Sequence, residues 1–216
     1  MTDRLIKAIH PADEFHGKAI KRIALPKRRP FALWFTGYSA AGKSTVAYAL
    51  EQRFLDAGQS AFVLDGDLLR RGLNRDLDFS PAHRSENVRR IAEVAKLMNA
   101  AGLTVICSLI SPYRNDREIA CAIIGPEHFI EVHISTSLAE CERRDPKGLY
   151  RRARAGELPD FTGVTAPYEV PLAPAVSLDT SRLTVEECVD RISKLVLPSY
   201  KAVKKKASNQ VSMPSV

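Results

Sequence analysis

The chain has 216 residues, enough for one domain with a substantial core and too few for two comfortable ones. Hydrophobic residues make up 45% and charged residues 26%, as in ordinary soluble proteins, and the aromatic share of 7% argues against a nucleic-acid surface built on repeated base stacking. The net charge of +7 favours anionic partners without choosing among phosphate-bearing small molecules, nucleic acids and membrane surfaces.

No segment has the composition of a signal peptide or a membrane span. The N-terminus lacks an apolar core, and the longest uncharged run, residues 97–113, is interrupted by Asn99, Gly102 and Pro112. We therefore expect a soluble, cytoplasmic protein with no membrane partner. The widely spaced cysteines form no metal-binding pair and are expected to be reduced and packed; they are Cys107, Cys121, Cys141 and Cys188.

Short apolar runs alternate with helical periodicity along the chain. We expect strands at 31–36, 61–64, 103–108, 129–134 and 175–178. Between and after them we expect a helix that ends at Gly58, a helix at 83–101 and a last helix at 184–197. This alternation predicts an α/β fold with a parallel five-stranded sheet and helices on both faces. A basic extension (1–30) precedes the domain (31–198), and a basic tail (199–216), which we expect to be disordered, follows it.

The segment Gly37-Tyr-Ser-Ala-Ala-Gly-Lys-Ser44 fits the phosphate-loop pattern G-x-x-x-x-G-K-[ST] between an expected strand and an expected helix. In such a loop main-chain N–H groups and the positive end of the helix dipole face phosphate. Lys43 is expected to reach the β- and γ-phosphates, and the Ser44 hydroxyl to bind Mg²⁺. The predicted ATP-binding residues are Gly37, Tyr38, Ser39, Ala40, Ala41, Gly42, Lys43, Ser44 and Thr45.

The phosphate loop leaves the class of acceptor open. The chain contains no N-K-x-D segment that would read guanine, and it is short for a motor ATPase, which leaves a small-molecule kinase. Asp65-Gly66-Asp67 follows a strand at the end where α/β sheets place ligands. We assign metal support to Asp65 and proton abstraction from the acceptor hydroxyl to Asp67. The alternative is that both aspartates only form a turn.

Several segments resemble the adenylyl-sulfate kinase family, in the family's order. They are residues 64–74, 76–80 and 84–90, Ile110-Ser-Pro112, residues 144–150 and Phe161-Thr-Gly163. The resemblance implies a P-loop, nucleotide-kinase-like fold that uses ATP and Mg²⁺. It further implies phosphorylation of the 3′-hydroxyl of adenylyl sulfate, which yields 3′-phosphoadenylyl sulfate in sulfate assimilation. A homodimer without a nucleic-acid partner is the expected form.

The resemblance also assigns acceptor contacts by position. Arg70, Arg84 and Asn87 match residues that hold the phosphosulfate and ribose groups, a role that suits planar guanidinium groups. Phe79 and Phe161 match a pair of rings that sandwiches the adenine.

Further acceptor contacts fall on Ile110, Ser111, Lys147 and Thr162. Ser111 matches a serine proposed to carry phosphate in some members and is kept among the candidate catalytic residues with Lys43 and Asp67. Because a phosphate loop already positions both substrates, we expect direct in-line transfer.

Six basic residues crowd into residues 143–154. The resemblance implies that this segment is a mobile lid that closes over the nucleotide and excludes water. The alternative is a charged helix face exposed to solvent.

Five positions depart from the family's pattern: Tyr38, Ala40, Leu68, Asp78 and His83. Ala40 stands for a loop glycine and fits without strain if its φ is negative. The last three border the acceptor pocket, so they leave the acceptor open: another nucleotide conjugate, such as a cytidine diphosphate derivative, is the first alternative. The second is a nucleic-acid- or membrane-binding module that uses two basic arms, Lys27-Arg-Arg29 and Lys204-Lys-Lys206.

Overall fold

The computed structural model of the chain describes residues 30–197. The predicted extension up to residue 29, the predicted tail and both basic arms lie outside the described residues. Five strands form one parallel sheet in the order β2-β3-β1-β4-β5, which confirms the predicted α/β class. The strands are β1 (Ala32–Thr36), β2 (Ala61–Asp65), β3 (Thr104–Ser108), β4 (Phe129–Ile134) and β5 (Val176–Leu178).

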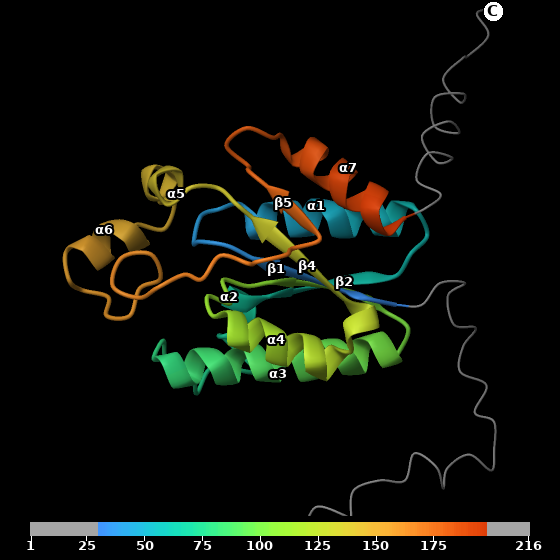
Figure 1. Cartoon of the computed structure of the whole chain (residues 1–216), viewed down its shortest axis with the longest axis horizontal. Coiled ribbons are helices and arrows are strands. Elements are labelled where there is room, and N and C mark those ends of the chain that lie inside the picture. The colour runs from blue at the N-terminus through green and yellow to red at the C-terminus, as the bar shows by residue number, and fades with distance from the viewer. Residues whose placement is uncertain (1–29, 198–216) are drawn as a thin grey trace, which may run out of the picture.

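Helices cover both faces of the sheet, with α1 and α7 on one side and α3 and α4 on the other (Figure 1). The helices are α1 (Lys43–Asp56), α2 (Gly66–Leu69), α3 (Pro81–Ala100), α4 (Arg114–Ile124), α5 (Leu138–Arg144), α6 (Leu149–Arg154) and α7 (Val185–Val196), with a 3₁₀ turn η1 (Pro126–His128) before β4. No helix within residues 30–197 has the length and apolar character needed to cross a bilayer.

The central strand β1 shows how the sequence builds two cores. Side chains alternate across a strand, so Leu33 and Phe35 point to the face covered by α1 and α7, and Ala32 and Trp34 to the face covered by α3 and α4. All four are fully buried. This explains why the strand reads as an unbroken apolar run instead of an alternating one.

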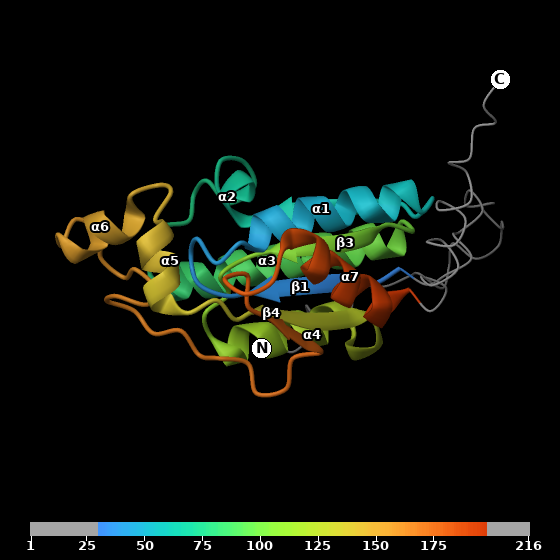
Figure 2. The same ribbon diagram turned by 90° about the horizontal axis from the view of Figure 1, so that it is seen from above.

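The predicted strands and long helices agree with the structure to within one or two residues at each end. Helices α2, α4, α5 and α6 were not predicted. The cysteines are free thiols as expected, and Cys107, Cys141 and Cys188 are buried. Helices α5 and α6 project beyond the sheet at the end where the loop from β1 to α1 lies, as two perpendicular views show (Figures 1 and 2).

Candidate active site

A cavity of about 500 Å³ opens at the carboxyl ends of the strands. The phosphate loop and the start of α1 line one part of it, and α2, the loop after it, the start of α3 and the α5–α6 connection line the rest. It collects most of the predicted site residues: Ser39, Ala40, Gly42, Lys43, Ser44, Thr45, Asp65, Asp67, Arg70, Phe79, Arg84, Asn87, Ile110, Ser111 and Lys147. The predicted residues outside its lining are Gly37, Tyr38, Ala41, Phe161 and Thr162.

Lys43 is the buried cation of the phosphate loop. Its Nζ donates to the carbonyl oxygens of Gly37 (3.0 Å) and Tyr38 (2.6 Å), so the side chain folds back across its own loop. Burial lowers the pKa of Lys43 to about 8, because the ammonium has lost most of its water. Phosphate oxygens at this place would add negative charge to that of Asp65 and Asp67 and so favour the ammonium form of Lys43.

The affinity for ADP is expected to fall as the pH rises above about 8. Bound phosphates favour the charged form of Lys43, so above this pH binding must first restore a proton that the free protein has lost. One proton taken up lowers the affinity by up to about tenfold per pH unit. Calorimetric titrations at about pH 7 and about pH 9 measure the ADP affinity at each pH. In Lys43→Met the affinity should be the same at both pH values. An equal affinity of the unchanged protein at both pH values would contradict the assignment.

Two glycines of the loop have backbone angles that fit glycine best. Gly37 has a φ of 150° and a side chain there would meet the Ile134 carbonyl oxygen at 2.5 Å, and Gly42 has a φ of 97°. Ala40 has a φ of 60°, which is the left-handed region. The condition that its φ be negative is therefore not met, and the loop holds alanine in a strained conformation where the family has glycine.

Three oxygen-bearing side chains meet between the phosphate loop and the ends of β2 and β3. The Ser44 hydroxyl donates to Asp65 Oδ2 (2.6 Å) and lies 3.2 Å from the Ser108 hydroxyl. The other carboxylate oxygen of Asp65 accepts the main-chain N–H groups of Asp67 (2.9 Å) and Leu68 (3.3 Å) and so begins α2. Asp65 thus forms the predicted turn and also offers a hard oxygen ligand to the cavity.

Asp67 faces the connection between α5 and α6. Its carboxylate forms an ion pair with Lys147, which lies between α5 and α6. Both side chains are well exposed, at 65% and 59%, so this pair contributes little to stability and can exchange partners when a ligand enters.

Phe79 lies between two arginines. The Arg70 guanidinium carbon is 4.4 Å and that of Arg84 5.5 Å from the ring centre, and Arg84 Nε donates to the Phe79 carbonyl oxygen (2.8 Å). Burial, and then the neighbouring charge of Arg84, lower the pKa of Arg70. The Phe79 side chain is 55% exposed and can stack on a flat ring of a ligand. The two arginines beside it can stabilise an anionic group attached to that ring.

The loop that carries Phe79 is tied to α3 by polar contacts. Asn74 Nδ2 donates to the Asn87 side-chain oxygen (3.0 Å) in the interior. Near the surface, Asp78 Oδ1 lies 2.8 Å from His83 Nδ1. The Asp78 main-chain N–H also donates to His83 Nδ1 (3.2 Å), so both the main chain and the side chain of Asp78 contact His83.

Ser111 and Ile110 lie where β3 ends. The Ser111 hydroxyl accepts the indole N–H of Trp34 (3.1 Å), and Ser111 is only 3% exposed with a φ of 35°. The Ile110 carbonyl oxygen accepts the Thr36 hydroxyl (2.7 Å), which ties this turn to the strand that leads into the phosphate loop. The main chain here is therefore fixed relative to the phosphate site.

Phe161 and Thr162 lie behind the lid. The Phe161 ring packs edge-on against Tyr150 of α6, with centroids 5.0 Å apart, and the buried Thr162 hydroxyl has no hydrogen-bond partner among residues 30–197. Arg84 connects this segment to the acceptor side, because its Nη2 donates to the Asp160 carbonyl oxygen (2.6 Å). The aromatic sandwich of Phe79 and Phe161 stays a prediction.

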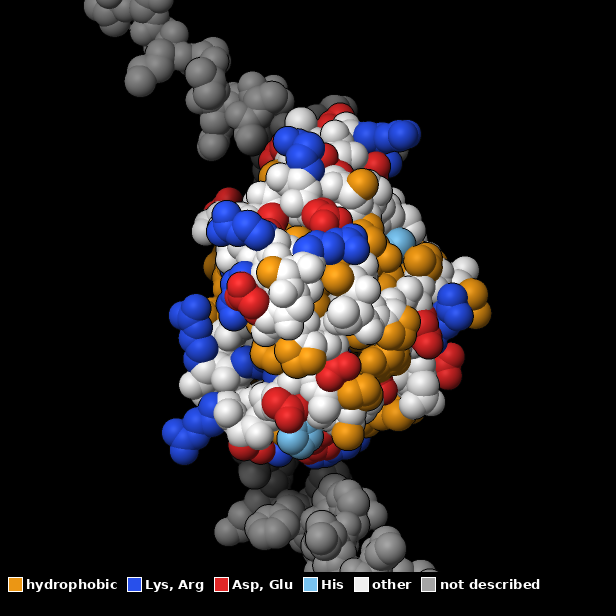
Figure 3. All heavy atoms as spheres, turned by 90° about the vertical axis from the view of Figure 1, so that its left-hand side faces the viewer, with side chains coloured by type: hydrophobic (Ala, Val, Ile, Leu, Met, Phe, Trp, Pro, Cys, Tyr) orange, Lys and Arg blue, Asp and Glu red, His pale blue; other side chains and the backbone are white. Residues whose placement is uncertain are grey.

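Most arginines of the lid segment are paired with carboxylates. Arg143 and Arg144 both bind Glu140, which has a pKa of about 2 as a result, and Arg154 binds Glu142. The face that includes this end of the molecule carries side chains of both charge signs (Figure 3). Of the cations between residues 143 and 154, Arg144 and Lys147 line the cavity.

Sequence reasoning missed a set of residues that supports the site from behind. Arg117 of α4 donates to the Ser111 carbonyl oxygen (2.7 Å) and pairs with Glu131, and it is buried. Thr136 and Thr180 hold the phosphate loop from the other side. No motif marks these three residues, because each acts on a segment far away in the sequence.

Comparison with known proteins gives one consistent family. A family model described as adenylylsulphate kinase matches residues 29–179. The adenylyl-sulfate kinase of Pseudomonas entomophila is 52% identical over 82% of this chain and 87% of its own length. The structure of the Mycobacterium tuberculosis APS kinase in complex with AMPPNP and APS shares 45% identity at a TM-score of 0.76 and covers 78% of this chain and 98% of that chain. A hexameric APS kinase from Thiobacillus denitrificans shares 35% identity at a TM-score of 0.58 over 78% of this chain and 29% of that chain.

Proposed function

The chain belongs to the adenylyl-sulfate kinase family, and we propose that the residues described above perform that family's reaction in the roles given below. The protein is an ATP-dependent kinase that transfers the γ-phosphoryl group to the 3′-hydroxyl of adenylyl sulfate, giving 3′-phosphoadenylyl sulfate and ADP. One observation carries the assignment of roles: the phosphate loop and the Arg70, Phe79 and Arg84 cluster line the same cavity.

ATP binds with its phosphates on the loop before α1. Main-chain N–H groups and the N-terminus of α1 face the phosphates, and Lys43 exchanges its two carbonyl partners for phosphate oxygens. The Ser44 hydroxyl and the Asp65 carboxylate would hold Mg²⁺, since they are adjacent hard oxygens and this ion is usually held by one or two protein ligands together with substrate phosphates. A bound Mg²⁺ neutralises charge on the phosphates during transfer.

Adenylyl sulfate binds on the other side of the cavity. Its adenine stacks on the exposed ring of Phe79, and Arg70 and Arg84 bind the phosphosulfate group. Arg70 covers one face of the ring in the free protein, so acceptor binding replaces a cation–π contact with a charge-assisted hydrogen bond.

Asp67 takes the proton from the 3′-hydroxyl as the oxygen attacks the γ-phosphorus, and the O–P bond to ADP breaks. Its ion pair with Lys147 is released at that stage, and the lysine is then free to bind phosphate. We propose direct transfer, which the low exposure of Ser111 and its contact with the Trp34 indole N–H support.

A panel of acceptors tests the assignment. Purified protein with Mg²⁺ and ATP is expected to release ADP with adenylyl sulfate and to give no turnover with a cytidine diphosphate conjugate. The cytidine alternative rests on Leu68, Asp78 and His83, which lie next in sequence to the lining residues Asp67, Phe79 and Arg84 but are not in the lining themselves. Turnover with the cytidine compound alone would reverse the choice of acceptor while leaving the phosphate-loop chemistry intact.

Phe79→Ala serves as the matched variant in the same assay. Removal of the ring should raise KM for adenylyl sulfate about 5- to 150-fold, because base stacking on an aromatic side chain contributes about 1–3 kcal/mol. KM for ATP should stay near that of the unchanged protein. Equal increases in both KM values would contradict the place of the adenine on Phe79.

A homodimer and a cytoplasmic location also stay predictions for this chain. The hexameric state is a property of the Thiobacillus denitrificans relative. Light scattering of the purified full chain would give the mass of the assembly.

A further inference from the structure

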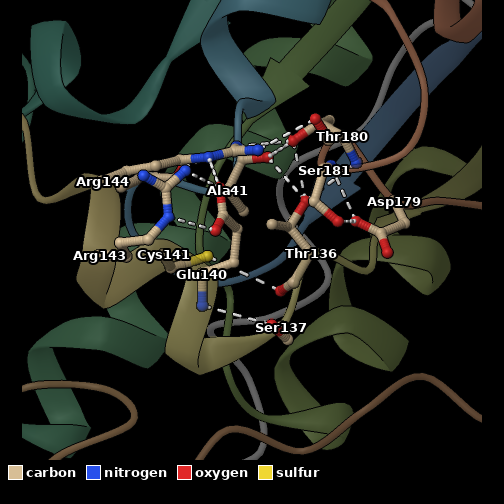
Figure 4. Close-up of polar contacts among 11 residues, drawn as sticks. Ala41, Thr136, Ser137, Glu140, Cys141, Arg143, Arg144, Asp179, Thr180 and Ser181 are labelled. Carbon is tan, nitrogen blue, oxygen red and sulfur yellow. Dashed lines mark hydrogen bonds and ion pairs between the residues drawn. The ribbon is translucent and has the colours of Figure 1, made fainter.

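Two threonine hydroxyls converge on one carbonyl of the phosphate loop. Thr136 follows β4 and Thr180 follows β5, and both donate to the Ala41 carbonyl oxygen, at 3.2 and 2.8 Å (Figure 4). Ala41 and Thr136 are buried and Thr180 is half-buried. Neither threonine lines the cavity, so neither is placed to touch a bound nucleotide.

Each hydroxyl is itself oriented by a donor. Arg144 Nη1 donates to Thr180 Oγ1 (2.8 Å), and its Nη2 donates to the Thr180 carbonyl oxygen (3.0 Å). The Thr180 main-chain N–H donates to Thr136 Oγ1 (3.0 Å). The two hydroxyl oxygens also lie 2.9 Å apart, where either can donate to the other. When each instead accepts from the N–H donors above, its own proton points to the Ala41 carbonyl oxygen. Both lone pairs of that carbonyl are then occupied.

The carbonyl of Ala41 fixes the direction of an N–H group on the other side of the same peptide. In a trans peptide the C=O and the N–H point in opposite directions, so a carbonyl turned toward the two threonines turns the Gly42 N–H away from them. Gly42 lines the cavity, and the Thr180 side chain lies directly behind it, since a side chain added at Gly42 would meet Thr180 Oγ1 at 3.1 Å.

We infer that Thr180 and Thr136 are positioning residues that aim the Gly42 amide at the phosphates of ATP. The inference rests on the proposed function for the identity of the nucleotide. Arg144 extends the arrangement to α5, because it also binds Glu140 there. The lid segment and the phosphate loop are thereby joined through Thr180.

Thr180→Val tests the inference, since valine keeps the shape of threonine and removes the hydroxyl. We expect the dissociation constant of ADP, measured by calorimetry with the full chain, to rise about fivefold, the equivalent of one hydrogen bond of about 1 kcal/mol. The binding of adenosine, which has no phosphate, should not change. Thr180→Ser keeps the hydroxyl and should bind ADP as the unchanged protein does.

Thr136→Val is a second, independent variant that should weaken ADP binding in the same way. It keeps the test valid even if Thr180→Val fails to fold. Unchanged ADP affinity in folded valine variants would overturn the inference. So would an equal loss for adenosine, or a serine variant as weak as the valine variant. Because ADP binding needs no acceptor, a failure of the protein to phosphorylate adenylyl sulfate would leave this result readable.

Discussion

Replacement of Lys43 by alanine is expected to lower kcat at least about 10²- to 10³-fold, the usual cost of losing one preorganised group that stabilises transition-state charge. Lys43 is the buried cation of the phosphate loop, and its Nζ is held only by carbonyl oxygens of that loop. The two cations of the α5–α6 region that line the cavity have partners elsewhere, Arg144 with Glu140 and Thr180, and Lys147 with Asp67. Single-turnover kinetics with saturating ATP would measure the loss of the chemical step.

The fold should survive this change. Burial lowers the pKa of Lys43 to about 8, which means that the charged side chain is unfavourable in the free protein and that its removal relieves this cost. Lys43→Met keeps the length of the chain without the charge and should have a melting temperature equal to or above that of the unchanged protein. A methionine variant that kept a large part of the activity would show that the ammonium is not required.

The sequence predicted the five strands and helices α1, α3 and α7, which together supply most of the buried apolar core. It missed α4, because the buried side of this helix includes Asp116 and Arg117, and two charged residues hide a helical pattern. Arg117 is tolerated there because it pairs with Glu131 at 2.7 Å and donates to two main-chain carbonyls. Such partners are set by the tertiary fold and cannot be read from neighbours in the sequence.

The site residues likewise fall into those that the sequence predicts and those that only the tertiary fold reveals. The phosphate loop could be predicted because its parts are consecutive, from the strand through Lys43 to the helix. The acceptor side could be located through motifs that resemble a family. The two threonines behind the loop could not, because Thr136 and Thr180 meet Ala41 only through the sheet order, which places β4 beside β1 and β5 beside β4. The positive φ of Ala40 is likewise a property of the folded loop.

Asp67→Asn is expected to lower kcat by about 10²- to 10⁴-fold, the range for loss of a general base. Asparagine has nearly the same shape as aspartate but cannot accept the proton of the 3′-hydroxyl. The contact that begins α2 uses the main-chain N–H of Asp67, at 2.9 Å from Asp65 Oδ1, and is retained in the variant. KM for ATP should therefore change little, which steady-state kinetics would show.

Lys147→Ala distinguishes a base from a residue that only anchors the lid. The ion pair joins Asp67 to Lys147, so either variant breaks it. If Asp67 served only to hold the lid, both variants would lose activity to the same extent. If Asp67 accepts the proton, the alanine variant keeps the base and should lose far less of kcat than Asp67→Asn does. The ratio of the two kcat values therefore distinguishes the role of Asp67 as proton acceptor from its role as the ion-pair partner of Lys147.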